Sequence, residues 1–207
     1  VPVIFCMVLD PIRYDLKAPN LTGILMEIPI ERHLSTMRQA LPAVRRIGVL
    51  FDPGKSQSFV DEARRQAKAQ GFELVARGVA SDKDVAAAAR ALISQIDLLW
   101  LIPDSTVLSE DSLRFLLDLA LEHTIPSVGF SSEFVRSGAL MALSVSYPET
   151  GRQAAQVARK LLNGEGSDLS GRLLTPNQTR ITVNSKTARY LGLTIPPEIM
   201  REAESVN

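Results

Sequence analysis

The sequence predicts an α/β fold with a doubly wound parallel sheet. Three short apolar segments in the middle of the chain, RRIGVLF, DLLWL and IPSVGF, each end in a polar turn. Continuous apolar runs of this length are typical of parallel strands that are buried on both faces. Segments with the apolar spacing of helices lie between them, and this order favours parallel strands joined by right-handed crossovers. Because open α/β sheets bind ligands beyond the carboxyl ends of their strands, the polar turns predict a ligand-binding edge.

Composition argues against several classes of protein and partner. Lys plus Arg and Asp plus Glu both number 23, so no net field attracts nucleic acid or an anionic membrane, and we expect no nucleic-acid partner. Cys6 is the only cysteine, which excludes an internal disulfide and a Cys-rich zinc site, and we expect neither a metal nor a cofactor. No apolar run approaches the roughly 18 residues of a membrane span, and the first residues show no signal-peptide pattern.

The first 42 residues carry two short strands and one helix. Val3 to Leu9 and Leu21 to Leu25 read as apolar strands that are separated by a polar loop. From Ile30 the apolar residues follow helical spacing until Pro42 ends the pattern. These segments are too far from the middle of the chain to extend its sheet without long crossings, so we expect them in a separate lobe.

Residues 43 to 147 alternate strands and helices with short connections, which predicts one complete doubly wound lobe. The helices are expected to start at polar residues that can cap them: Ser56 or Ser58, then Asp82 or Asp84, then Ser109, then Ser132. The predicted strands are 47–51, 72–79, 98–102, 125–130 and 138–144. Trp100 lies inside one of these strands and is expected in the core, whereas His33 and His123 are expected at the surface or at a boundary.

After Tyr147 the chain is expected to return to the first lobe. A long helix runs to Leu162, a Gly-, Ser- and Asn-rich crossing follows, Thr179 to Asn184 reads as a strand, and Pro196 and Pro197 start a last helix. The predicted organisation is therefore a partial lobe 1 (1–42), a complete lobe 2 (43–147) and a return to lobe 1 (148–207). A chain that crosses between lobes more than once suits a hinge around a cleft.

Several motifs follow one another in a recognisable order. VIFCMVLDP, NLTGI, RRIGVLFDPGKSQS, PDSTV, IPSVGFS, VRSGALMALSVSYPETGRQAA and LLNGE occur in this sequence along the chain. The series resembles the substrate-binding proteins of bacterial ABC importers, in the type I periplasmic-binding fold group that includes binders of aromatic amino acids. The resemblance covers nearly all 207 residues. It implies two α/β lobes that close on a small molecule, with amino acids among the candidate ligands.

The resemblance also implies how such a protein works. Members of the family are exported to the periplasm or the cell envelope, deliver their ligand to an ABC permease in the membrane, and perform no chemistry on it. The chain is therefore expected to be a solute-binding component and not an enzyme. Transferred motif by motif, the family's ligand-binding positions fall on polar residues in loops at predicted strand ends: Asp10, Ser56, Gln57, Ser58, Asp104, Ser105, Ser131, Ser146 and Tyr147.

Two departures from the family pattern carry consequences. Ser146 stands where the family commonly has an acidic residue, so the group expected to hold a ligand's ammonium is absent. The family's further βαβα region ahead of VIFCMVLDP is also missing, which suggests a truncated form or a short homologue. The remaining strands near Val3, Leu21 and Thr179 would make a small sheet with an unpaired edge, and we expect a homodimer through this incomplete lobe.

Other readings stay open at this stage. Asp104 after its strand can serve as a turn or cap residue, and the hydroxyls of Ser56 and Ser58 can cap a helix instead of holding a ligand. The main alternative function is a ligand-sensing domain of a regulator or receptor with the same fold. The third class is an enzyme on a doubly wound scaffold, which fold alone does not exclude.

Overall fold

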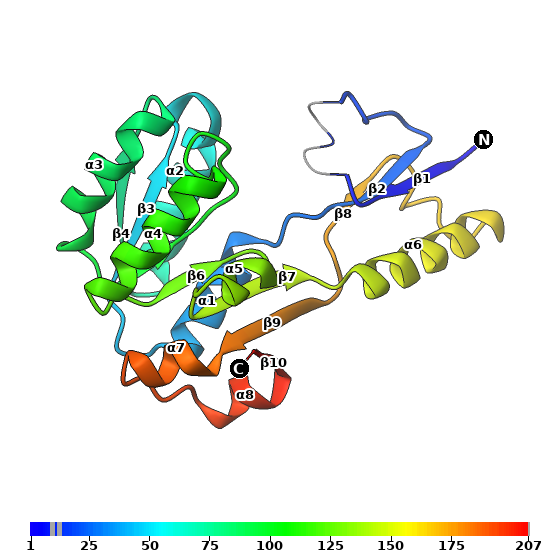
Figure 1. Ribbon diagram of the computed structural model, residues 1–207. Coiled ribbons are helices and arrows are strands. Elements are labelled where there is room, and N and C mark those ends of the chain that lie inside the picture. Colours follow the sequence, from blue (N-terminus) through cyan, green and yellow to red (C-terminus); the bar gives the residue numbers. More distant parts are fainter. Residues whose placement is uncertain (9–10, 12–13, 207) are drawn as a thin grey trace. The chain divides into compact units, whose positions relative to one another are not determined.

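The computed structural model describes residues 1–8, 11 and 14–206, and contacts divide the chain into two compact units (Figure 1). The small unit contains Val1–Pro29 and Ser144–Arg180, and the large unit contains Ile30–Leu143 and Ile181–Asn207. Each unit has its own sheet. The α/β fold with parallel strands that the sequence predicts is confirmed.

A seven-stranded sheet forms the centre of the large unit, in the order β10-β9-β7-β6-β5-β3-β4. Parallel pairing joins β10 to β9 and, separately, runs through β7, β6, β5, β3 and β4, as expected when helices connect the strands. The strands run over β3 (Arg46–Phe51), β4 (Glu73–Gly78), β5 (Leu98–Trp100), β6 (Ser127–Gly129), β7 (Met141–Val145), β9 (Thr179–Asn184) and β10 (Ala203–Val206).

Helices pack on this sheet in pairs. Leu50 and Leu99 belong to the core cluster that α3 and α4 also build, whereas the Trp100 ring contacts residues of α1 and α2. Leu99 and Trp100 are neighbours in β5, and each packs against a different pair of helices. Consecutive residues of the strand are therefore buried, which explains the continuous apolar runs of the sequence. The helices of the large unit are α1 (Ile30–Ala40), α2 (Pro53–Ala69), α3 (Asp82–Ile93), α4 (Glu110–Glu122), α5 (Ser132–Arg136), α7 (Ser185–Tyr190) and α8 (Pro197–Glu202).

Local signals set the ends of α2 and α4. Asp52 caps α2 by accepting the N–H of Gly54, and Pro53 takes the first helical position, where a missing N–H costs nothing. The predicted caps Ser56 and Ser58 are therefore wrong, because the cap of α2 is Asp52, four residues before Ser56. Gly71, with φ +75°, follows the end of α2 in a conformation that glycine adopts without strain. The predicted Ser109 cap of α4 is confirmed and forms a capping box with Ser112.

The small unit holds a three-stranded parallel sheet in the order β1-β2-β8. Its elements are β1 (Val3–Cys6), β2 (Leu21–Ile24), β8 (Leu173–Leu174) and α6 (Tyr147–Leu162). Helix α6 packs on β1 and β2, where Thr22 and Ile24 are fully buried, and the Thr22 hydroxyl donates to the Leu169 carbonyl at 3.0 Å. The ring of Phe5 lies so close to Gly23 that a Cβ there would meet it at 2.2 Å.

The division differs from the predicted lobe boundaries in two places. Helix α1 was expected in lobe 1 and belongs to the large unit, because its buried residues pack against α2 and Trp100. The strand 179–184 was expected beside the first strands of the chain, but it lies in the seven-stranded sheet between β7 and β10. Asn184 fixes it there: its N–H donates to the Leu140 carbonyl at 2.9 Å and its side-chain amide to the Val135 carbonyl at 2.9 Å. Strand β8, in a stretch that was predicted to be a crossing without a strand, pairs with β2 instead.

His33 is buried and not at the surface as predicted. Its side chain is 8% exposed, its ring centroid lies 5.5 Å from that of Trp100, and its Nδ1 has no hydrogen-bond partner. Trp100, the only tryptophan, is 2% exposed, so its predicted core position is confirmed. Burial lowers the pKa of His33 to about 4, because the imidazolium would lose its hydration without gaining a partner.

We expect His33 to weaken the fold in mild acid. The pKa of His33 in the folded state lies below that in the unfolded state, so the unfolded chain takes up the proton first. Stability is then lost as the pH falls from about 6.5 to about 4, by about 3 kcal/mol in total. The free energy of unfolding is measured by urea titration at a series of pH values. Its loss in mild acid should become smaller in His33→Leu and should stay unchanged in His123→Leu, a matched change at an exposed histidine. Parallel losses in wild type and His33→Leu would contradict the assignment.

Candidate functional site

Four loops meet the carboxyl edge of the large sheet. Strands β6, β5, β3 and β4 are parallel neighbours in this order, so their carboxyl ends face the same way. The segments that follow these strands contain Ser131, Asp104, Asp52 and Val79 respectively. Three of these loops carry predicted or newly found polar residues, and the edge is therefore the candidate site.

Asp104 is a buried carboxylate that joins two of these loops. It is 3% exposed, and its Oδ2 accepts the Asp52 N–H at 2.8 Å and the Ser56 hydroxyl at 2.7 Å. Its Oδ1 accepts the N–H groups of Thr106 and Val107 at 2.9 and 3.3 Å. A carboxylate offers about four lone-pair sites, so these four donors occupy its capacity. Asp104 thus ties the start of α2 to the loop after β5.

Two further bridges between the same loops lie closer to the surface. The Thr106 hydroxyl donates to Asp52 Oδ2 at 2.7 Å, and Lys55 Nζ donates to the Ser105 hydroxyl at 2.8 Å. The hydrogen bonds from the Thr106 hydroxyl and the Gly54 N–H, together with the charge of Lys55, lower the pKa of Asp52. Asp52 therefore carries its negative charge at neutral pH.

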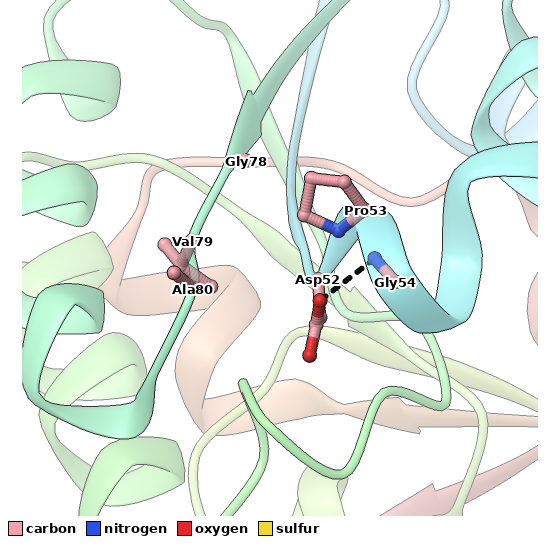
Figure 2. Close-up of a pocket in the computed structure, with 6 residues that line it drawn as sticks. All are labelled: Asp52, Pro53, Gly54, Gly78, Val79 and Ala80. Atoms are coloured by element: carbon pink, nitrogen blue, oxygen red, sulfur yellow. Dashed lines mark hydrogen bonds between the residues drawn. The ribbon is translucent and has the colours of Figure 1, made fainter.

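A hollow of about 460 Å³ lies between the loops that follow β3 and β4 (Figure 2). Pro53 and Gly54 line it on one side, and the backbone of β4 and the loop after it lines the other side. Asp52 is the charged residue among the lining side chains. The complete lining is Asp52, Pro53, Gly54, Gly78, Val79 and Ala80.

The predicted residues on α2 and after β5 fall into two groups. Ser56 and Asp104 are buried and bonded to each other beneath the edge. Gln57, Ser58 and Ser105 are exposed; Gln57 donates to Asp61 at 3.0 Å, and Ser105 accepts from Lys55. Among these five residues, Ser105 is the one that is exposed and also takes part in the hydrogen bonds between α2 and the loop after β5.

The other predicted residues lie elsewhere along the chain. Ser131, half-buried after β6, caps α5 by accepting the Glu133 N–H at 3.3 Å. Ser146 and Tyr147 belong to the small unit, where Ser146 is buried at the start of α6 and Tyr147 is 60% exposed. Asp10 lies outside the described residues.

Sequence reasoning did not include Asp52, Lys55 and Thr106 among the site residues. The sequence could have indicated Asp52, because an acidic residue between a strand and a proline commonly caps the helix that follows. Thr106 had no such signal, since its role depends on a partner 54 positions away.

Within the residues that the structure describes, no group of three or more His, Cys, Asp or Glu side chains is placed to hold a metal ion. In the same residues, no helix has both the length and the apolar character needed to cross a bilayer.

Comparison with known proteins now adds the family. The family model described as "ABC transporter substrate binding protein" matches residues 1–207. The chain belongs to this family. The resemblance to this family that the motifs indicated is confirmed, and so is the similarity of the fold to substrate-binding proteins of the periplasmic-binding type.

Individual members give the degree of similarity. A tyrosine-binding protein of Clostridioides difficile is 27% identical over 202 residues, which are 93% of this chain and 57% of that protein. A ligand-free, open structure of a Clostridium difficile substrate binding protein with adhesive properties covers all of this chain and 71% of its own, at 26% identity and TM-score 0.82. A Streptococcus pneumoniae ABC domain in complex with L-Trp, at 23% identity and TM-score 0.74, covers all of this chain and 72% of its own, and shows the shared fold.

The share of a relative's length that this chain covers decides which properties family membership implies. The chain spans 57% of the length of the tyrosine-binding relative. The ligand, the transport role and the partners of the whole protein are therefore proposals for this chain.

Replacing Asp104 should destabilise the large unit more than replacing an exposed carboxylate. Asp104→Ala leaves the N–H groups of Asp52 and Thr106 and the Ser56 hydroxyl without their acceptor, which should lower the free energy of unfolding by about 3 kcal/mol. Asp118→Ala on the exposed side of α4 is the control and should change it by less than about 0.5 kcal/mol. Equal effects of the two substitutions in denaturant titrations would refute the role given to Asp104.

Proposed function

We propose that this chain is the solute-binding component of a bacterial ABC importer, which binds a small molecule reversibly and releases it unchanged. The observation that carries the proposal is the family match over residues 1–207. Small-molecule sites commonly combine apolar walls with a few fixed polar groups, and the edge of the large sheet has both.

An amino acid is the proposed ligand class. The support is that one relative is named a tyrosine-binding protein and that a structural neighbour is in complex with L-Trp. Ser105, Ser131, Ser146 and Tyr147 remain predicted contacts of the ligand. Ligand binding would shift the conformational equilibrium of the protein toward the form that binds most tightly.

The proposed partner is an ABC permease in the membrane, and the proposed location is the periplasm or the cell envelope. Both follow from family membership. We also propose that the chain is not an enzyme. The polar groups of the edge bond to one another across the two loops, an arrangement that suits rigid presentation of a binding surface.

A ligand-sensing domain of a regulator or receptor is the alternative class. Both classes bind small molecules on the same fold, so binding alone does not separate them. Interaction with a permease separates them: purified chain with its ligand should stimulate the ATPase of the cognate transporter in vesicles if it is an importer component.

A solute screen tests the binding function directly. Aromatic and branched amino acids, nucleosides and small sugars are added to the chain in a thermal-shift assay. A true ligand at 100 times its Kd should stabilise the fold by about 2.7 kcal/mol and should be recovered chemically unchanged. A screen with no stabilising solute, or a solute that is converted to a product, would refute the proposal.

Tyr147 offers a local test because it is exposed and adds little to the core. Tyr147→Ala should weaken binding of an aromatic ligand by about tenfold, through loss of ring packing, with the melting temperature of the free protein unchanged. Tyr190→Ala is the matched control, since this tyrosine is 68% exposed on α7 of the large unit. If both variants bind alike, Tyr147 does not contact the ligand.

A further inference from the structure

The two carboxylates at the edge of the large sheet differ in the capacity left for a ligand. All the accepting sites of Asp104 are taken by four protein donors, and the residue is buried. Asp52 is half-buried, and each of its oxygens accepts one hydrogen bond, from Gly54 N–H at 2.8 Å and from the Thr106 hydroxyl at 2.7 Å. Asp52 therefore has accepting capacity left, and it lines the hollow.

We propose that Asp52 is the ligand-contacting carboxylate of the large unit, that Asp104 is its positioning residue, and that the hollow takes the ammonium end of a ligand with a compact apolar body. This inference rests on the proposed function and assigns roles within that same site. It reverses the expectation from sequence, in which Asp104 contacts the ligand.

The positioning role follows from what Asp104 holds. It accepts the backbone N–H of Asp52 at 2.8 Å and the N–H of Thr106 at 2.9 Å. Thr106 in turn donates its hydroxyl to the Asp52 carboxylate. One buried group thus fixes both the backbone of Asp52 and the side chain that orients its carboxylate. A carboxylate held in this way loses little freedom on binding, which favours affinity.

The ligand class follows from charge and from the walls. Asp52 is ionised, and a charge-assisted hydrogen bond from an ammonium is the strongest contact that a carboxylate makes with an amine. Lys55 is the nearby cation that competes for Asp52, but its Nζ donates to Ser105 in the loop after β5. Pro53, Val79 and Ala80 supply apolar wall, and Gly54 and Gly78 leave room without side chains. A cationic group with a small apolar neighbour matches this lining.

The test uses two probes of similar shape and different charge. Tyramine carries an ammonium, and 4-propylphenol is its neutral counterpart. Both are titrated calorimetrically into the full chain and into three variants. Asp52→Asn keeps a good helix cap and removes the charge, Asp104→Asn weakens the support beneath it, and Asp118→Asn is the exposed control on α4.

The proposal predicts a distinct pattern for each variant. Wild type and Asp118→Asn should bind tyramine about tenfold more tightly than 4-propylphenol, the size of one charge-assisted hydrogen bond. Asp52→Asn should lose about this factor for tyramine and nothing for 4-propylphenol. Asp104→Asn should weaken both probes by the same factor, because it loosens the hollow without removing a contact to the ammonium.

Other patterns overturn the proposal. Unchanged tyramine affinity in Asp52→Asn, or equal affinity of wild type for the two probes, removes Asp52 as the contact. A loss in Asp104→Asn that is confined to tyramine makes Asp104 the contact instead. If Asp104→Asn does not fold, Ser56→Ala, which removes one donor of the same network, takes its place and should weaken both probes equally.

The solute screen keeps this inference separate from the proposed function. If wild type binds neither probe, the ammonium site is wrong. A neutral solute that stabilises the chain in that screen would then leave the binding function standing, and a screen without any hit would remove both.

Discussion

The candidate site depends on one buried carboxylate. Asp104 accepts hydrogen bonds from both loops that it joins, and burial makes each of these bonds costly to lose. The start of α2 and the loop after β5 are thereby fixed to each other, although they are about 50 residues apart. The surface bridges from Thr106 and Lys55 follow the same pairing. A rigid edge of this kind would lose little conformational entropy on binding a ligand.

Much of the large unit could be predicted from local sequence. Apolar runs bounded by turns located β3, β5 and β6, because parallel strands buried on both faces are short, continuous and apolar. The unit boundaries could not be read in the same way. Strand β9 looks like any other strand, and its place beside β7 depends on pairing with a distant segment, which Asn184 secures. The two-residue β8 and the last strand β10 carry too few residues for a periodic signal.

The sequence indicates where polar residues follow the strands, and whether they contact a ligand stays a prediction. Asp104 and Ser105 lie in the loop after β5, as expected for the carboxyl edge of a parallel sheet, whereas Ser56 lies inside α2. Residue type alone does not distinguish a buried acceptor, such as Asp104, from a carboxylate that lines a hollow, such as Asp52. The error over His33 arose because a single polar residue on an amphipathic helix gives no sign of the Trp100 ring that it contacts.

The central claim is that the chain holds an unmodified small molecule at the carboxyl edge of its large sheet. Backbone amide shifts of the ¹⁵N-labelled chain, followed by NMR during titration with a stabilising solute, test it most directly. The account predicts saturable shifts concentrated at residues 52–56, 78–80 and 104–106, with the solute spectrum unchanged over time. Saturable shifts confined to other parts of the large unit, or progressive conversion of the solute, would contradict it.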